Sequence, residues 1–390
     1  MSGYIFALDS LDTLRLYAEN GVYATKISRP DHYWMANHLY TLGDYLTMRP
    51  RDLVFFFIKR KIYGVGRLVR IPESDSASAA ICNYPQSYMP GCDRTQTELL
   101  WDEHDNFDRP WLCLFEPFPY FFKDGLDMDE VLDADVRGVV QALRVFERVS
   151  FVQMRDDEAN LLYDLFVRRC GEPSAEHFED GHASSHEDIR QRLATASHDY
   201  AINARQLIRG YIQPSGEARS EAALETWLID EIGRKDSSVG NILGNWAFVT
   251  HQVPASPHKP TQYMDRIDVL GWETRQLAES ARPTINRFKV VEVKKDSLAG
   301  QYGEGTIAQL MKYVDWITAH EAGGDYGMVD AYLIAHDFSE DTIQYCMEKA
   351  KREFVFQRRP FVSRTWDSVS LVGYWYNRET GLLNLERLYP

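Results

Sequence analysis

The chain has 390 residues, a length that predicts two or three domains, and its content of 44% hydrophobic and 13% aromatic residues can fill packed cores. Its net charge of −15 argues against a general nucleic-acid binder, because phosphate binding depends on Lys and Arg, but it leaves room for a local basic surface. No apolar run is long enough to span a membrane, the start lacks a secretion signal, and five scattered cysteines without a CxxC pair fit a reducing compartment, so we expect a cytoplasmic protein.

The first 171 residues predict a small β-rich domain with flanking helices. Apolar runs bounded by turn residues indicate its strands, and apolar residues at helical spacing indicate its helices. Strands are expected at 4–8, 23–28 and 110–122 and in two runs of 52–71 around a turn at 59–61, and helices at 10–20, 128–146 and 156–171.

The remainder of the chain predicts a connector and an α/β domain. The polar stretch 172–187 is typical of a linker, and with a helix expected at 187–212 it makes 172–217 the connector. Residues 218–390 predict a mixed sheet covered by helices, so the chain is α+β overall. Strands are expected at 245–253, 266–272, 288–296 and 329–338, helices at 220–233, 306–320 and 339–354, and a terminal hairpin at 369–388.

Charged residues interrupt two of these apolar strands. Glu292 and Lys294 lie two apart in FKVVEVKK, and Asp268 lies in RIDVLGW. One interpretation is an ordinary half-exposed strand, because the period of two puts Glu292 and Lys294 together on one face. The other is a metal site: carboxylates suit Mg²⁺ or Mn²⁺, the backbone carbonyl of Val293 could add a ligand, and Lys294 would orient water and stabilise the transition state of phosphodiester hydrolysis.

Two helices could bring further groups to the same end of the sheet. Glu221 and Glu225 share a face of the helix at 220–233, and Gln309 and Tyr313 share a face of the helix at 306–320. Each has a plainer explanation. Glu221 can favour the helix dipole at the first turn, Glu225 is better explained as a solvated residue than as a metal ligand, and Tyr313 can be core packing.

The ordered set, D…ExK preceded by a helix glutamate and followed by a Q-x-x-x-Y helix, resembles the PD-(D/E)xK nuclease superfamily. The stretches RIDVL, VVEVKK and AQLMKY look most similar to the NucS/EndoMS nuclease domain, with a related core in the Shedu antiphage nucleases. The resemblance spans about residues 218–320. It implies a restriction-endonuclease-like fold, catalysis by Asp268, Glu292 and Lys294, and an accessory role for Gln309 and Tyr313.

The resemblance also has departures. The SEAAL stretch is similar to the family's T/S-E-x-x-L and favours Glu221 over Glu225 as a metal ligand. Asp265 stands where that family usually has Gly. The connection over 273–287 is long, so we expect an extended hairpin or an extra loop.

Several basic residues are candidates for nucleic-acid contact. Arg266 and Lys295 flank the expected site, and Arg266 is equally compatible with a plain surface charge. The stretch KAKREFVFQRRPFVSR, which includes Arg358 and Arg359, predicts a surface for the DNA backbone or merely a solvated helix end.

The N-terminal stretches MRPRDLVFFF and IYGVGRLV resemble the core of PUA-like folds of the EVE, ASCH and YTH type. That resemblance implies a small β-barrel that holds a modified or flipped base by aromatic stacking. The candidate aromatic residues are Tyr33, Trp34, Phe55 and Trp111, although aromatic residues of a small β-domain mostly pack in its core.

Together these patterns predict an Mg²⁺- or Mn²⁺-dependent DNA endonuclease of prokaryotic defence or restriction, with DNA as partner, no membrane association and a homodimer or higher oligomer. A mismatch or branched-DNA repair nuclease similar to NucS is one alternative. A catalytically inactive nucleic-acid-binding protein is another.

Overall fold

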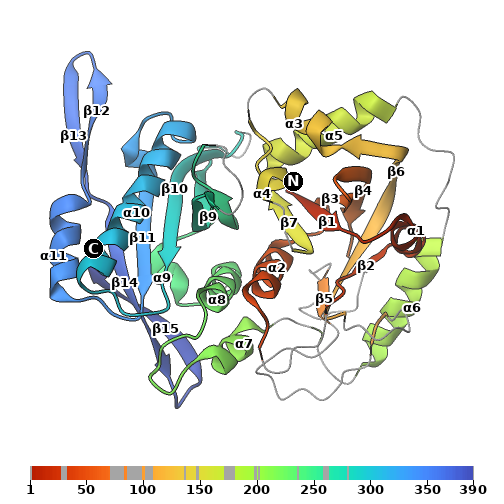
Figure 1. Cartoon of the computed structure of the whole chain (residues 1–390), viewed down its shortest axis with the longest axis horizontal. Coiled ribbons are helices and arrows are strands. Elements are labelled where there is room, and N and C mark those ends of the chain that lie inside the picture. The colour runs from red at the N-terminus through yellow and green to blue at the C-terminus, as the bar shows by residue number, and fades with distance from the viewer. Residues whose placement is uncertain are drawn as a thin grey trace. The chain divides into compact units, whose positions relative to one another are not determined.

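The computed structural model divides the chain into two compact units, Met1–Asn203 (unit 1) and Ala204–Pro390 (unit 2), each shown in Figure 1. Their boundary lies within the segment 172–217 that the sequence predicts as a connector. The structure describes residues 2–27, 33–70, 83–85, 99–101, 109–135, 138–145, 149–170, 181–196, 200, 203–234, 237–257, 263–278 and 281–389. Among these residues no helix has the length and apolar character needed to cross a membrane.

Unit 1 combines a curved sheet with helices. Its strands are β1 (Gly3–Ala7), β2 (Val22–Ala24), β3 (Leu53–Ile58), β4 (Lys61–Leu68), β5 (Asn83–Pro85), β6 (Trp111–Asp127) and β7 (Phe151–Met154). Its helices are α1 (Leu11–Asn20), α2 (Ala36–Thr47), α3 (Met128–Ala134), α4 (Ala142–Val145), α5 (Asp156–Cys170) and α6 (Gly181–Thr195). The sheet order is β2-β6-β4-β3-β1-β7, with β5 also paired to β6 and with β1 and β3 parallel.

Two local predictions for unit 1 are confirmed. The helix α1 ends at Gly21, whose φ of 61° provides the left-handed backbone of a helix end. The β3–β4 turn falls at Lys59 and Arg60, which both have positive φ, as a tight hairpin turn requires. The coarse α+β class is also confirmed, whereas the PUA-like barrel remains a prediction.

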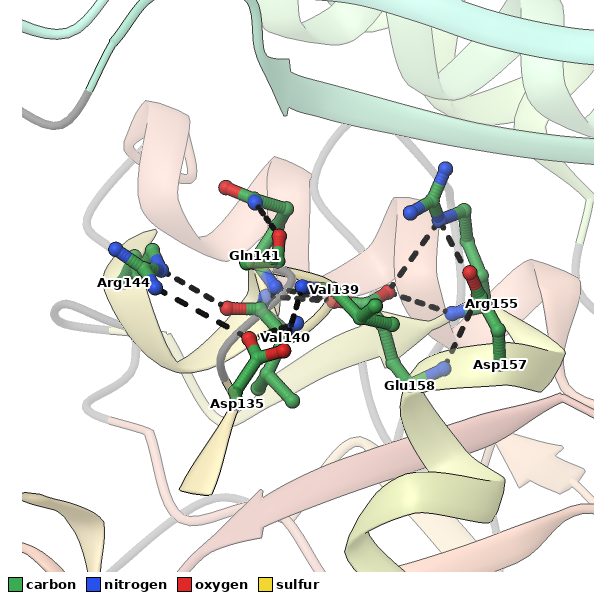
Figure 2. A network of polar contacts seen from close by, with 10 residues as sticks. Asp135, Val139, Val140, Gln141, Arg144, Arg155, Asp157 and Glu158 are labelled. Carbon is green, nitrogen blue, oxygen red and sulfur yellow. Dashed lines mark hydrogen bonds and ion pairs between the residues drawn. The ribbon is translucent and has the colours of Figure 1, made fainter. Parts of the chain in front are cut away.

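The single helix predicted over 128–146 is wrong. Asp135 is the C-cap of α3, and the described residues 138–141 before α4 are not helical. The carboxylates of Asp135 and Glu158 accept hydrogen bonds from backbone N–H groups of this segment, which a continuous helix would have satisfied internally (Figure 2). The bonds join Asp135 to the N–H of Val139 (2.8 Å) and Val140 (2.7 Å), and Glu158 to the N–H of Gln141 (2.5 Å) and Ala142 (3.0 Å).

The single helix predicted over 187–212 is also wrong. It corresponds to α6 in unit 1 and α7 (Ala204–Tyr211) in unit 2. Within unit 1, Ile189 of α6 is buried in an apolar cluster with Val22 and Leu112, and a ring nitrogen of His186 lies 2.8 Å from the carbonyl oxygen of Gly21. Part of the predicted linker 172–187 is therefore a packed helix, and its residues 172–180 lie outside the described residues.

Unit 2 is an α/β unit. Its other helices are α8 (Glu221–Gly233), α9 (Val239–Leu243), α10 (Gly300–His320), the 3-10 helix η3 (Tyr326–Met328) and α11 (Glu340–Lys349). Its strands are β8 (Phe248–Pro254), β9 (Arg266–Arg275), β10 (Thr284–Val293), β11 (Val329–Ala335), β12 (Arg352–Arg358), β13 (Phe361–Trp366), β14 (Val369–Asn377) and β15 (Leu382–Tyr389). The main sheet has the order β15-β14-β11-β10-β9-β8, and β12 pairs with β13.

The main sheet is mixed, as the sequence predicts. The strands β10, β11 and β14 run parallel, and β8, β9 and β15 complete antiparallel edges. Phe288 and Val290 of β10 share a core cluster with Ile307, Leu310 and Val314 of α10. The helix α10 therefore covers the face of β10 to which its even-numbered side chains point.

The long connection at 273–287 is an extended hairpin. The strands β9 and β10 pair antiparallel from Thr284 opposite Arg275 to Val291 opposite Val269, with one irregularity near Asn286. Both ends of the apparent insert, 273–275 and 284–287, are therefore strand, and the prediction of an extended hairpin is confirmed.

The helix predicted over 339–354 is correct only in its first part. Ser339 caps α11 by accepting a hydrogen bond from the Thr342 N–H at 3.3 Å. The helix ends at Lys349, and Arg352 already begins β12. The basic stretch is a β-hairpin, so the interpretation as a solvated helix end is wrong.

Candidate active site

Glu292 occupies the centre of the site. It follows Phe288 and Val290 at even spacing on β10 and therefore points toward the face that α10 covers. Its side chain is 0% exposed, so the alternative of an ordinary half-exposed strand is wrong. Among the described residues, none donates a hydrogen bond to one of its carboxylate oxygens, Oε2. Burying such an oxygen costs free energy unless another group compensates it.

Asp268 is held against the end of β10. Its Oδ2 accepts a hydrogen bond from the backbone N–H of Val293 at 2.8 Å. The antiparallel register that places Val269 opposite Val291 brings Asp268 beside Val293. The carboxyl groups of Asp268 and Glu292 lie close enough to share a proton. The structure thus ties Val293 to the site through its N–H, while coordination by its carbonyl remains a prediction.

Lys294 supplies the positive charge of the site. Its Nζ lies 2.6 Å from Oε1 of Glu292, and its side chain is only 12% exposed. Burial disfavours the ammonium, but the Glu292 and Asp268 carboxylates outweigh it and raise the pKa of Lys294. Lys294 is therefore a permanent cation at neutral pH.

The helix α8 brings two acids to the site, and one corrects an expectation. Glu225 is buried, so its interpretation as a solvated helix residue is wrong. The reason is that α8 is buried on nearly every side, from Ala222 to Ile229. Glu221, at the first turn, is partly exposed, and its charge raises the pKa of both Glu225 and Asp268. Ser220 occupies the predicted N-cap position of α8 without a side-chain capping bond.

Gln252 links these acids, and the sequence analysis does not identify it. Its Nε2 donates to Oε2 of Glu225 at 3.0 Å and lies 3.4 Å from Oδ1 of Asp268. The φ of Gln252 is 52°, although the β8–β9 register continues unbroken from His251 opposite Val269 to Val253 opposite Ile267. A left-handed non-glycine residue within a strand is uncommon, and such residues cluster at functional sites. The sequence offers no distinct signal for it, because Thr250 and His251 of β8 are polar as well.

The accessory pair on α10 also lies at the site. The Nε2 of Gln309 donates to the Tyr313 hydroxyl at 2.8 Å. The Tyr313 ring belongs to the core cluster, so it does pack in the core, but burial and the nearby Glu292 and Asp268 charges raise the pKa of its hydroxyl. The prediction that Tyr313 packs in the core is confirmed, and its accessory role remains a prediction.

The acids of the site repel one another. Burial, with the charge of Asp268, raises the pKa of Glu292 to about 8, and burial raises the pKa of Asp268 to about 6 although Lys294 opposes it. Burial and the Asp268 charge also raise the pKa of Glu225 well above its usual range. Lys294 offsets part of the negative charge of Asp268 and Glu292, and protons or a further cation would offset the rest.

The donor chemistry fits a hard divalent cation. The described residues contain no group of three or more His, Cys, Asp or Glu side chains disposed to hold a metal ion. However, Mg²⁺ is commonly bound through one or two carboxylates and keeps several waters. Oε2 of Glu292 without a donor, beside the Asp268 carboxylate, matches that requirement, with Glu225 and Glu221 nearby.

The predicted nucleic-acid contacts of unit 2 fall in two places. Arg266 begins β9, and Lys295 follows the site with its Nζ 3.4 Å from Asp296. Arg358 and Arg359 are exposed at the turn between β12 and β13. Lys295 directly follows the catalytic candidate Lys294 in the chain. Arg358 and Arg359 lie on a separate hairpin.

The aromatic candidates of unit 1 are mostly core residues. Trp34, Phe55 and Trp111 are buried, and the rings of Trp34 and Trp111 pack edge to face with centroids 5.2 Å apart. Tyr33 is exposed. A stacking platform for a base remains a prediction, with Tyr33 the accessible member of the predicted set.

Comparisons with known proteins leave the family open. No family model and no curated protein matches the chain. The crystal structure of protein Atu2648 from Agrobacterium tumefaciens is similar over 44% of this chain and 94% of its own, with 14% sequence identity and a TM-score of 0.24. A likeness of that size carries no argument about function.

Proposed function

We propose that unit 2 is a metal-dependent nuclease domain that hydrolyses phosphodiester bonds of DNA. The observation that carries this proposal is the buried group of Asp268, Glu292 and Lys294, with Oε2 of Glu292 lacking a donor. A sheet core gains no stability from buried acids that raise one another's pKa. Such a group is expected where charge has a chemical use.

The order of elements supports the same proposal. An acid-bearing helix (α8) precedes three antiparallel strands, of which β9 carries Asp268 and β10 carries Glu292. The helix α10, with Gln309 and Tyr313, and the parallel strand β11 follow. This is the arrangement that the PD-(D/E)xK resemblance implies.

Each side chain has a role in this chemistry. A bound Mg²⁺ would be held by Asp268 and Glu292 and would supply Lewis-acid polarisation and a lowered pKa of bound water. Lys294, fixed on Glu292, stabilises negative charge that develops on the phosphate. Gln252 holds the carboxylates of Glu225 and Asp268 in position, and the buried valines of β10 exclude water from the floor of the site.

The test is cleavage of duplex DNA by the full chain with Mg²⁺ or Mn²⁺. We expect activity that EDTA removes and that Asp268→Asn or Lys294→Ala lowers by on the order of 100-fold or more. Asp330→Asn is the matched control, because this carboxylate pairs with Arg287 on the same sheet outside the site. Cleavage by Asp268→Asn at the rate of the natural chain would refute the site.

The choice of substrate separates the alternatives. Plain, modified, mismatched and single-stranded DNA should be compared under the same conditions. Preferred cleavage of modified DNA supports a defence nuclease directed by a modified base, whereas preferred cleavage of mismatched DNA supports a repair nuclease. Binding without cleavage of any of these substrates supports the inactive nucleic-acid-binding protein.

A further inference from the structure

The hairpin formed by β12 and β13, here the basic ribbon (residues 351–366), is anchored at its base. Trp366 is buried and donates from Nε1 to the Val329 carbonyl at 2.8 Å. Arg352 forms two hydrogen bonds with Asp315 of α10, at 2.8 and 2.9 Å. The two strands pair with each other and with no strand of the main sheet, and Figure 1 shows them projecting from the rest of unit 2.

Beyond its base the basic ribbon is exposed on both faces. Phe361 is 72% exposed, Val355 49% and Phe356 46%. A two-stranded hairpin of this kind is marginally stable in water and buries little of its own surface. Seven residues of strand extend about 20 Å, so the tip lies far from the anchored base. Exposed aromatic side chains at this distance are expected to serve a partner.

The charge of the basic ribbon identifies that partner. It has five basic residues against one acidic residue, Glu353, in a chain with a net charge of −15. Arg358 and Arg359 stand at the tip, and the Arg364 guanidinium stacks 3.5 Å above the Phe356 ring. In the described part of the chain, no acidic side chain forms an ion pair with these three arginines. This surface complements a polyanion, and like charge disfavours edge-to-edge pairing with a second copy.

The shape favours a duplex over a single strand. The major groove of B-form DNA admits a two-stranded β-ribbon, and Arg is the side chain that best combines phosphate contact with recognition of guanine edges. In the ladder, Arg358 lies directly opposite Phe361, so charge and apolar surface share the tip. We infer that the basic ribbon inserts into the major groove of double-stranded DNA and holds it for the nuclease proposed above, on which this substrate assignment rests.

The experiment measures binding of a fluorescent DNA duplex to the full chain in EDTA, across a range of salt concentrations. The variant Arg358→Gln/Arg359→Gln/Arg364→Gln removes the ribbon charges. We expect affinity to fall at least about 30-fold at low salt, and the slope of log K against log salt to become shallower by about 3, one unit for each lost contact.

A matched control removes the same number of charges elsewhere. Arg60, Arg168 and Arg169 are exposed arginines of unit 1, and their replacement by Gln should change affinity less than about threefold. Equal loss in both triple variants would overturn the inference, because total charge would then explain it. A hairpin variant that loses single-strand binding equally, or that changes self-association and not duplex binding, would overturn it as well.

Cleavage by the same proteins separates this inference from the proposed function. If duplex binding depends on the basic ribbon but no metal-dependent cleavage is detected, the inference about the ribbon stands. The proposed nuclease function is then refuted. If cleavage depends on Asp268, and if the ribbon substitutions change neither cleavage nor binding, the inference about the basic ribbon is refuted. The proposed nuclease function then stands.

Discussion

Gln252 combines a strained backbone with contacts to two buried acids. A left-handed conformation costs an L-residue such as Gln about 1 kcal/mol relative to Gly. The side chain that incurs this cost donates to Glu225 and approaches Asp268. Position 252 therefore carries a residue that its backbone conformation disfavours. The contacts of the side-chain amide with Glu225 and Asp268 explain why Gln is present there.

The substitution Gln252→Gly separates backbone from side chain. It relieves the positive φ and removes the amide, so the melting temperature should change by no more than a few degrees. The affinity for Mn²⁺, measured by calorimetry, should fall about tenfold, because Glu225 and Asp268 lose the group that positions them. Lys59→Gly is the control, since it relieves a positive φ of 45° away from these acids. Unchanged Mn²⁺ affinity in Gln252→Gly would show that the amide positions nothing.

Asp52 should make the stability of the chain depend on pH. Its carboxylate is buried and accepts from the N–H groups of Arg49 and Ser2, yet burial raises its pKa from 3.8 to about 6. Between these values the folded state holds the proton more tightly than the unfolded state. Stability therefore falls as the pH rises from about 4 to about 6 and is constant above that.

The measurement compares the natural chain with Asp52→Asn from pH 3.5 to pH 7. The difference in free energy of unfolding should shift by about 2–3 kcal/mol against the natural chain over this range. Asn does not titrate, so the variant is the reference that lacks the pH dependence of Asp52. A difference that stays constant with pH would contradict the raised pKa of Asp52.

At the scale of elements, carboxylates decide where the predicted helix at 128–146 is interrupted. Glu158 on α5 accepts hydrogen bonds from the N–H groups of Gln141, Ala142 and Arg155 (Figure 2). These donors have no helical acceptor. A pattern of apolar spacing does not record an acceptor that comes from another helix.

Glu158→Ala should therefore destabilise unit 1. One buried and two partly buried N–H groups would lose their acceptor, which should cost about 2–4 kcal/mol. Hydrogen exchange of peptides from α5 and β7 reports the loss. Asp164→Ala on the exposed side of the same helix should change stability by less than about 0.5 kcal/mol. Equal effects of the two substitutions would show that Glu158 does not hold this segment.

The helices and strands that carry the candidate active-site residues explain why these residues were only partly predictable from the sequence. The pattern D…ExK identifies Asp268, Glu292 and Lys294 through its resemblance to the PD-(D/E)xK superfamily, while the period of a strand accounts only for Glu292 and Lys294 sharing a face. The burial of Glu225 could not be predicted, because a helix that is buried on nearly every side has no polar face to recognise. Gln252 was not identified, because its left-handed backbone departs from the regular strand that the alternation assumes.

At the scale of the whole molecule, charge is distributed unevenly. The total of −15 argues against nucleic-acid binding, while the basic ribbon concentrates positive charge on one projecting element. Acids gathered in a metal site also lower the total without opposing DNA binding elsewhere. The distribution of charge therefore carries more information about the partner than its sum does.

Apolar patterning in the sequence determined the α+β class and most of the strands of unit 2, because these depend on neighbours along the chain. The candidate trio came from a family resemblance and remains a prediction. The tertiary structure decided what depends on distant residues. Asp135 and Glu158 interrupt one predicted helix, packing against Val22 and Leu112 assigns α6 to unit 1, and α8 turns Glu225 inward. Burial is a property of the folded chain, and burial is what distinguishes a solvated Glu292 from a candidate metal ligand.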